Sequence, residues 1–126
     1  MNTPRQVLIV EDNEEWREHI LKEPLEEEGH RITTARSYQE AIAALETHSF
    51  DLVVVDINLT NVRGNRDGEK VLEHIARSGR SIPTIVVSGS RQVSPANVER
   101  FRPLAFLDKD RFNLLEYVAL LQRALH

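Results

Sequence analysis

The segment Leu52-Val53-Val54-Val55-Asp56 is an uninterrupted apolar run that ends in a carboxylate. A run that is apolar at consecutive positions is expected for a central strand that helices cover on both faces. Similar runs recur at residues 7–10 and 85–87, and segments with helical periodicity separate them. Because parallel strands of one sheet are joined by right-handed crossovers, this alternation predicts an α/β fold with a doubly wound, five-stranded parallel sheet.

Five strands and five helices are expected to alternate along the chain. Pro24 should kink or shorten the first helix, because it cannot donate a backbone hydrogen bond. Asp67 is expected to cap the third helix, and Asn113 with Glu116 is expected to cap the last one. The fourth helix is poorly encoded, since few of its residues are apolar and a proline follows it. The expected strands lie at residues 6–10, 30–35, 50–56, 82–88 and 104–107.

The composition is that of one ordinary globular domain in a chain of 126 residues, with 40% hydrophobic and 29% charged residues. The net charge of −4 argues against binding nucleic acid through a basic surface. The absence of cysteine excludes disulfides, thiol nucleophiles and cysteine-ligated metals. No apolar run approaches the ~20 residues of a membrane span. We therefore expect a cytoplasmic protein that contacts neither nucleic acid nor membrane directly.

Polar side chains follow several of the expected strands at the point where each strand ends. In a parallel α/β sheet these ends share one edge, and ligands bind there. Three crowded carboxylates destabilise one another without a cation, and Mg2+ prefers one or two carboxylates together with water and phosphate oxygens. The sequence therefore predicts one anion-and-metal site at this edge. Its expected members are Glu11, Asp12, Asp56, Ser88 and Lys109.

Four short motifs at these strand ends resemble those of the receiver domain of two-component response regulators. Each motif alone is weak, but their order at the correct strand ends, in a chain of receiver length, is specific. The resemblance covers about residues 5–125 and implies a flavodoxin-like fold with the strand order 2-1-3-4-5. The motifs are Val-Glu-Asp-Asn at 10–13, Val-Val-Asp-Ile-Asn-Leu at 54–59, Val-Val-Ser-Gly at 86–89 and Ala-Phe-Leu-Asp-Lys at 105–109.

The resemblance implies a phosphorelay switch that catalyses only its own phosphorylation and dephosphorylation. Asp56 would accept a phosphoryl group from a histidine kinase or a phosphotransfer protein, and Lys109 would neutralise charge on that group. Ser88 would then bond the phosphoryl group, and Phe106 would either turn inward as a switch or be plain core. Partner binding would change at the face of the fourth helix, fifth strand and fifth helix. The Mg2+ ligands would be Glu11, Asp12, Asp56 and the backbone carbonyl of Asn58.

The chain departs from the receiver pattern beside this site. Asp110 stands where receivers usually have a proline, so residues 109–113 should be rearranged or hold a strained bond. Thr60 replaces another proline, and the loop there carries an apparent insertion at Asn61–Arg66. This insertion could modulate partner access or phosphoryl lifetime, or it could be a tolerated surface loop.

The last helix has a wider apolar surface than one packing face needs. Its second stripe is expected to serve self-association or a downstream partner. Trp16, in contrast, is expected only to pack on the first helix, without a functional role. The stripe expected to face the sheet is Leu114, Val118, Leu121 and Leu125, and the outer stripe is Tyr117, Leu120 and Ala124.

Two other functions compete with the switch. A degenerate receiver could act only as a docking module, although the complete set of acids, hydroxyl and lysine argues against this. Residues 56–60 also resemble the nucleophile motif of haloacid-dehalogenase-type phosphohydrolases. That mechanism needs an acid two residues after the nucleophile, where this chain has Asn58. The hydrolase is therefore disfavoured.

Overall fold

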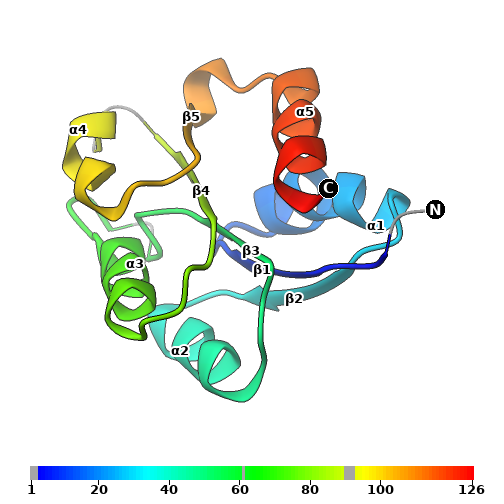
Figure 1. Ribbon diagram of the computed structural model, residues 1–126. Helices are drawn as coiled ribbons and strands as arrows, with labels where there is room; N and C mark the ends of the chain where they lie inside the picture. Colours follow the sequence, from blue (N-terminus) through cyan, green and yellow to red (C-terminus); the bar gives the residue numbers. More distant parts are fainter. Residues whose placement is uncertain (1–2, 61, 90–92) are drawn as a thin grey trace.

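The computed structural model describes residues 3–60, 62–89 and 93–126, which form a five-stranded parallel sheet in the order β2-β1-β3-β4-β5 (Figure 1). The predicted fold and strand order are confirmed. Strand ends differ from the expected ones by up to two residues, which is usual where fraying sets the boundary. The strands are β1 (Gln6–Val10), β2 (Arg31–Ala35), β3 (Leu52–Val55), β4 (Thr84–Ser88) and β5 (Ala105–Asp108).

Helices cover both faces of this sheet. The first helical segment begins as a π-helix, η1 (Glu15–Lys22), and continues as α1 (Glu23–Glu27). The segment after β4 is short, as expected from its weak encoding: α4 (Pro95–Val98) is followed by a 3-10 turn, η2 (Glu99–Phe101). The remaining helices are α2 (Tyr38–Thr47), α3 (Asp67–Arg77), the 3-10 turn η3 (Lys109–Arg111) and α5 (Leu114–Leu125).

The first helical segment is interrupted beside Pro24, in line with the expectation of a shortened helix, whereas Asp67 differs from the sequence expectation. The hydrogen-bond register changes from π to α next to Pro24, which then lies in the first turn of α1, where a proline is tolerated. The N-cap of α3 is Arg66 rather than Asp67, and Asp67 is the first helical residue. Instead, Asn65 Oδ1 accepts a hydrogen bond from the Asp67 amide at 3.0 Å. The Asn113 cap of α5 is confirmed, because its side chain accepts from the Glu116 amide.

The sheet divides the interior into two cores because side chains of a strand alternate between its faces. Leu8 and Val10 of β1 pack with α2, α3 and α4, whereas Val7 and Ile9 pack with η1, α1 and α5. Figure 1 shows the corresponding layers, with α1 and α5 on one face and α2 to α4 on the other. Both faces of the central strands are therefore dry, as their sequence predicts.

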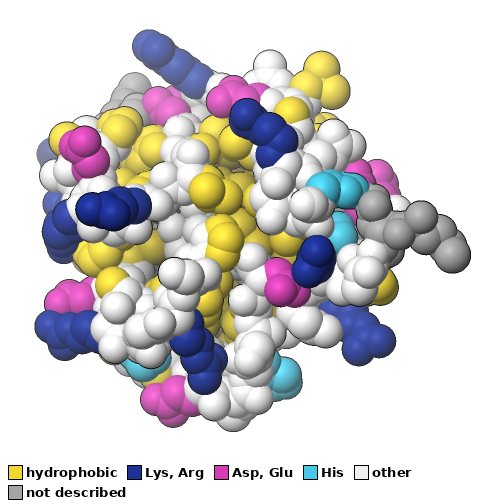
Figure 2. All heavy atoms as spheres, viewed as in Figure 1, with side chains coloured by type: hydrophobic (Ala, Val, Ile, Leu, Met, Phe, Trp, Pro, Cys, Tyr) yellow, Lys and Arg dark blue, Asp and Glu magenta, His cyan; other side chains and the backbone are white. Residues whose placement is uncertain are grey.

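The strand β5 is an edge strand and lies between α4 and α5 (Figure 1). Figure 2 shows hydrophobic side chains gathered in the middle of this face. Leu104, just before β5, is 53% exposed and contributes to the apolar surface. This face is the one on which the receiver resemblance places partner binding.

The predicted orientation of α5 is wrong for one turn of the helix. Tyr117 was expected on the outer stripe, but it is completely buried, while Leu114 is 51% exposed. The reason is polar: the Tyr117 hydroxyl donates a 2.8 Å hydrogen bond to the Leu21 carbonyl in the π-helix. A buried tyrosine needs such a partner, and this one lies on the sheet side of α5. The large apolar residues of α5 that are exposed are thus Leu114 and Leu115.

Removing the Tyr117 hydroxyl should therefore destabilise the fold. In Tyr117→Phe the Leu21 carbonyl loses its buried partner, and we expect a loss of about 1–2 kcal/mol in the free energy of unfolding. Urea denaturation followed by circular dichroism measures it. Tyr38→Phe, at the half-buried start of α2, is the matched control and should cost less than about 0.5 kcal/mol. Equal losses in both variants would contradict the assigned hydrogen bond.

Candidate functional site

The predicted site residues come together in one pocket at the carboxyl ends of β1, β3, β4 and β5. The pocket has a volume of about 490 Å³ and is open to solvent. Glu11 lies beneath it, fully buried, and contacts two of its lining residues. The lining residues are Asp12, Asn13, Glu14, Trp16, Asp56, Asn58, Ser88, Gly89 and Lys109.

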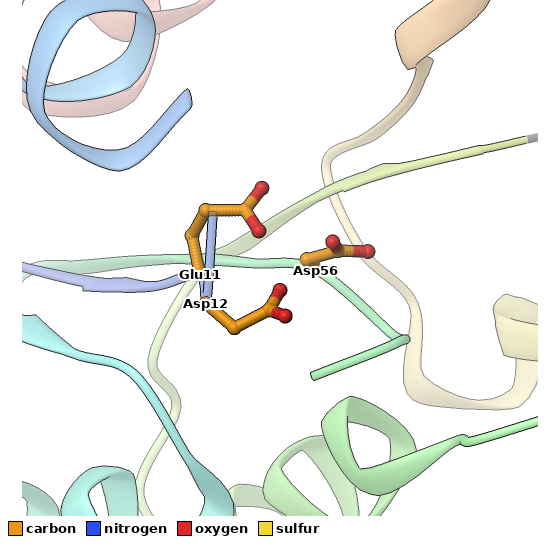
Figure 3. Close-up of side chains that lie close together, drawn as sticks. All are labelled: Glu11, Asp12 and Asp56. Atoms are coloured by element: carbon orange, nitrogen blue, oxygen red, sulfur yellow. The ribbon is translucent and has the colours of Figure 1, made fainter. Parts of the chain in front are cut away.

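Three carboxylates converge in this pocket. One oxygen each of Glu11, Asp12 and Asp56 lies within 4.8 Å of the others. Figure 3 shows the side chains of Glu11 and Asp12 both extending toward Asp56. Glu11 and Asp56 are buried, and Asp12 is half-buried at the rim. Carboxylates converging on one point with an open side suit a hard divalent cation that keeps some of its water.

Lys109 supplies the positive charge that these acids need. Its Nζ lies 2.6 Å from Oε1 of Glu11 and donates to Oδ2 of Asp56 at 2.9 Å. Burial lowers the pKa of Lys109, but the charges of Glu11 and Asp56 outweigh it, so the pKa lies above its usual value. The lysine therefore stays protonated and holds β5 to the ends of β1 and β3.

Glu11 has an unusual proton affinity. Burial, and then repulsion by the Asp56 charge, raise the pKa of Glu11 to about 8, although the Lys109 ammonium opposes them. A hydrogen bond from the Asn13 amide, at 3.2 Å, also favours the charged form. At neutral pH the cluster therefore tends to hold a proton, which a bound cation would displace.

Both oxygens of Asp56 have partners within the protein. Ser88 Oγ donates to Oδ1 at 2.8 Å, and the Asn58 amide donates to the same oxygen at 3.3 Å. Lys109 binds the other oxygen. The predicted set of acids, hydroxyl and lysine is thus assembled around one carboxylate. Asn58 lines the pocket, as its expected role requires.

Arg17 supports the acidic pair and was not singled out from the sequence. Its side chain is nearly buried, and Nη1 donates to the backbone carbonyls of Glu11 at 3.3 Å and Asp12 at 3.2 Å. Its Nε pairs with Glu18 at 2.9 Å. The arginine thereby fixes the backbone that carries both acids. The only sign of this role in the sequence was that Arg17, one residue after Trp16, falls within the apolar stripe of the helix.

The turn after Lys109 is rearranged, which is one of the two outcomes expected from Asp110. The described part of the chain contains no cis peptide bond. Lys109 begins the 3-10 turn η3, and Asp108 Oδ1 accepts from the Asp110 amide at 2.9 Å. A local side-chain cap thus shapes this turn without the proline that the receiver pattern has at position 110.

The loop after β3 is organised by asparagines. Asn65 Oδ1 accepts from the Leu59 amide at 3.0 Å, and Asn58 Nδ2 donates to the Val62 carbonyl at 2.8 Å. Asn61, the first residue of the apparent insertion, lies outside the described residues. An effect of the insertion on partner access or phosphoryl lifetime stays a prediction.

The insertion ends in an ion-pair network that reaches η2, the 3-10 turn after α4. Arg66 pairs with Glu69 at the start of α3, and Glu69 also pairs with Arg100 at 2.7 Å. Burial raises the pKa of Glu69, but both arginines outweigh it, so the pKa lies below its usual value. The network links the long loop to the segment after β4.

The beginning of α3 lies against the backbone of Asp56. Gly68 donates its amide to the Ile57 carbonyl at 2.8 Å. A Cβ atom at position 68 would lie 1.9 Å from the Asp56 carbonyl oxygen. No side chain fits there, so glycine is required by the close approach. The sequence shows this glycine but not the contact that requires it.

Gly68→Ala should therefore disturb the site and the fold together. The clash is with backbone, so α3 or the end of β3 must move, and we expect a loss of about 3 kcal/mol or more in unfolding free energy. Gly79→Ala is the control. Gly79 has a positive φ, but a Cβ there would meet no other atom, so this substitution should cost about 1 kcal/mol. Chemical denaturation of both variants checks the difference, and similar values would contradict the steric argument.

Comparison with known proteins agrees with this geometry. The sequence model of the response regulator receiver domain matches residues 7–108. This chain belongs to the response regulator receiver family. Over 82 residues it is 34% identical to the virulence transcriptional regulatory protein PhoP of Salmonella typhimurium, which covers 65% of this chain. The receiver spans about a third of PhoP, because the match covers 34% of that protein.

Solved receiver structures have the same fold. The non-phosphorylated receiver domain of HemR from Leptospira biflexa matches with a TM-score of 0.81 and 29% identity, covering 98% of this chain and 94% of that one. The response regulator TrrA from Thermotoga maritima, in complex with Mg2+-BeF, matches with a TM-score of 0.79 and 26% identity. That match covers 96% of this receiver and 99% of TrrA.

The raised pKa of Glu11 predicts a pH dependence of stability. Folding raises the pKa of Glu11 from 4.5 to about 8, so the folded state binds the extra proton between these values. The contribution of protonated Glu11 to the free energy of unfolding is therefore fully present below about pH 4.5 and is lost as the pH rises toward 8.

Metal-free protein tests this expectation. Between pH 5 and 8 the free energy of unfolding of wild type should fall relative to Glu11→Gln, which cannot titrate there. Urea titrations at several pH values measure the difference. A difference that stays constant or grows with pH would show that Glu11 is not protonated in the folded receiver.

Proposed function

We propose that this receiver is a phosphorelay switch in which Asp56 accepts a phosphoryl group from the phosphohistidine of a sensor kinase or phosphotransfer protein. The observation that carries the proposal is the arrangement around Asp56. A nucleophilic carboxylate lies at an open pocket with a lysine, a hydroxyl and two further acids in reach. These are the groups that phosphoryl transfer to a carboxylate needs.

In this transfer only Asp56 forms a covalent bond, and the other residues of the site supply charge and hydrogen bonds. An oxygen of Asp56 attacks phosphorus, the phosphorus–nitrogen bond of the donor histidine breaks, and the imidazole leaves with the electron pair and takes up a proton. Lys109 moves from the Asp56 carboxylate to a phosphoryl oxygen, where its charge offsets the charge that accumulates. Ser88 likewise exchanges its bond to Asp56 for one to the phosphoryl group.

Glu11, Asp12, Asp56 and the Asn58 carbonyl would hold Mg2+ in this scheme. The donor set fits, because it consists of oxygens only and one side of it is open to the pocket. When bound, Mg2+ would neutralise the repulsion between the carboxylates and the incoming phosphate. Glu11 must then give up the proton that its raised pKa favours.

The output would leave through the face of α4, β5 and α5. Ser88 ends β4 and is paired with Asp108 of β5, while Phe106 is paired with Val86 of β4. Phe106 is half-buried against the core on the α3 and α4 side, so inward movement of Ser88 can change its packing. A downstream protein or a second receiver would read this face, where Leu104, just before β5, is exposed.

A docking module that is never phosphorylated is the alternative. The turn at Asp110 departs from the family pattern, but it leaves Lys109 in contact with Asp56. A phosphohydrolase is not supported, because Asn58 cannot supply the second acid. In the described ranges no helix is long and apolar enough to span a membrane.

Labelling with a small phosphodonor tests the proposal. With acetyl phosphate and Mg2+, the receiver should gain one phosphoryl group, seen by intact mass spectrometry. Asp56→Asn should take up none, and chelation of Mg2+ should slow uptake at least about 100-fold, since charge neutralisation is then lost. Ser88→Ala keeps the nucleophile and should still be labelled. Label on Asp56→Asn, or none on wild type, would overturn the proposal.

A further inference from the structure

Lys109 has a third contact, which neither the family pattern nor the sequence led us to expect. Its Nζ lies 4.9 Å from the centre of the Trp16 ring. This is within the ~6 Å at which the face of an aromatic ring attracts a cation. Trp16 also lines the pocket of Asp56. The ammonium therefore lies between two carboxylates and one aromatic face.

The Trp16 ring is held from behind by a row of aromatic rings. Phe112 meets it edge-on, with 5.1 Å between centroids and 86° between planes. Phe112 in turn packs on Tyr117 at 5.6 Å, and the Tyr117 hydroxyl is bonded to the Leu21 carbonyl. Phe112 directly follows η3, so the turn that replaces the usual proline delivers this ring to Trp16.

The backbone of Trp16 is fixed at the other end. Its amide donates to Asn13 Oδ1 at 3.0 Å, at the start of the helical segment. Asn13 directly follows the acidic pair, and its own amide donates to Glu11. The ring is thus tied to the loop that carries Glu11 and Asp12, as well as to α5.

The carboxylate contacts of Lys109 are the ones that the reaction must disturb. A divalent cation held by the three acids would compete with the ammonium for the carboxylates of Glu11 and Asp56, which Lys109 now contacts. Without these carboxylate contacts, the Lys109 ammonium would be free to turn out into solvent before the phosphoryl group arrives, unless another group holds it. The Trp16 ring is not one of the groups that would hold the divalent cation, so its contact with the ammonium would remain.

We propose that Trp16 is a positioning residue for Lys109: its ring holds the ammonium over the pocket while the carboxylates turn to the metal. The inference rests on the proposed phosphoryl transfer, for which Lys109 must face the phosphoryl oxygens. Trp16 does not touch the reacting atoms and acts only through the lysine. An apolar side chain of similar size would fill the space but would not attract the charge.

The first test separates the ring face from its bulk. Trp16→Phe keeps an aromatic face and Trp16→Leu does not, while both lose packing. With acetyl phosphate at saturating Mg2+, Trp16→Leu should be labelled about five- to tenfold more slowly than wild type, and Trp16→Phe within about twofold, in keeping with cation–π strengths. Equal rates for Trp16→Leu and wild type overturn the inference.

The matched control is Ile20→Ala, one turn further along the same helix. Ile20 packs against the same core cluster, so its truncation lowers stability as a Trp16 variant does. It is not among the residues that line the pocket, and its labelling rate should stay within about twofold of wild type. If Ile20→Ala is slowed as much as Trp16→Leu, general loosening explains both and the inference fails.

The second test needs no phosphorylation. Trp16 is the single tryptophan of the chain, so intrinsic fluorescence reports on this ring alone. In metal-free protein, Lys109→Met should shift or brighten the emission, because the charge beside the ring is removed. The control is Lys70→Met, at an exposed side chain of α3, which should leave the emission unchanged. Unchanged emission in Lys109→Met overturns the ring contact, even if Trp16→Leu proves unstable.

The two tests also distinguish this inference from the function on which it rests. Wild type that takes no label overturns the phosphorelay function, and the positioning role falls with it. Wild type that is labelled on Asp56 while Trp16→Leu is labelled equally fast overturns the positioning role alone.

Discussion

The site depends on one buried charge balance, in which Lys109 lies between Glu11 and Asp56 at 2.6 and 2.9 Å. Removing one partner from a buried ion pair costs about 3–5 kcal/mol, because the other charge is left uncompensated. The lysine follows β5 as the acids follow β1 and β3, so the balance also joins three strands at one edge of the sheet. With Asp12 nearby, acids still outnumber the cation. The raised pKa of Glu11 and the affinity expected for a divalent metal follow from that excess.

Helical and strand periodicity made the fold predictable, and strand ends made the site predictable. Apolar runs around a central parallel sheet leave few alternatives, and a polar residue at the carboxyl end of each run marks the ligand edge. The strand order came only from the resemblance to receivers. Periodicity shows which residues share one face of a strand, but it does not show which strands are neighbours in the sheet.

The contacts that support the site were not predictable, because each depends on how closely two segments approach. Gly68 is an ordinary helix residue until α3 is placed against Asp56. Arg17 was not singled out and Trp16 was expected only to pack, because the sequence does not show the Glu11 carbonyl and the Lys109 ammonium that they contact. Tyr117 was assigned to the wrong stripe of α5 because apolar periodicity allowed two faces. The carbonyl of Leu21, which the sequence does not reveal, decided between them.

The same residues hold Asp56 before transfer and bind the phosphoryl group in the proposed mechanism. Ser88 and Lys109 occupy both Asp56 oxygens, so each must release the carboxylate as it takes a phosphoryl oxygen. The exchange costs little, because one charged acceptor replaces another. Ser88 ends a strand that is hydrogen-bonded to β5, and Lys109 begins the turn that leads to Phe112. In the proposed mechanism, a small displacement of either residue would therefore reach the edge strand β5 and the aromatic row beside α5, so that local exchange at one carboxylate would alter a surface.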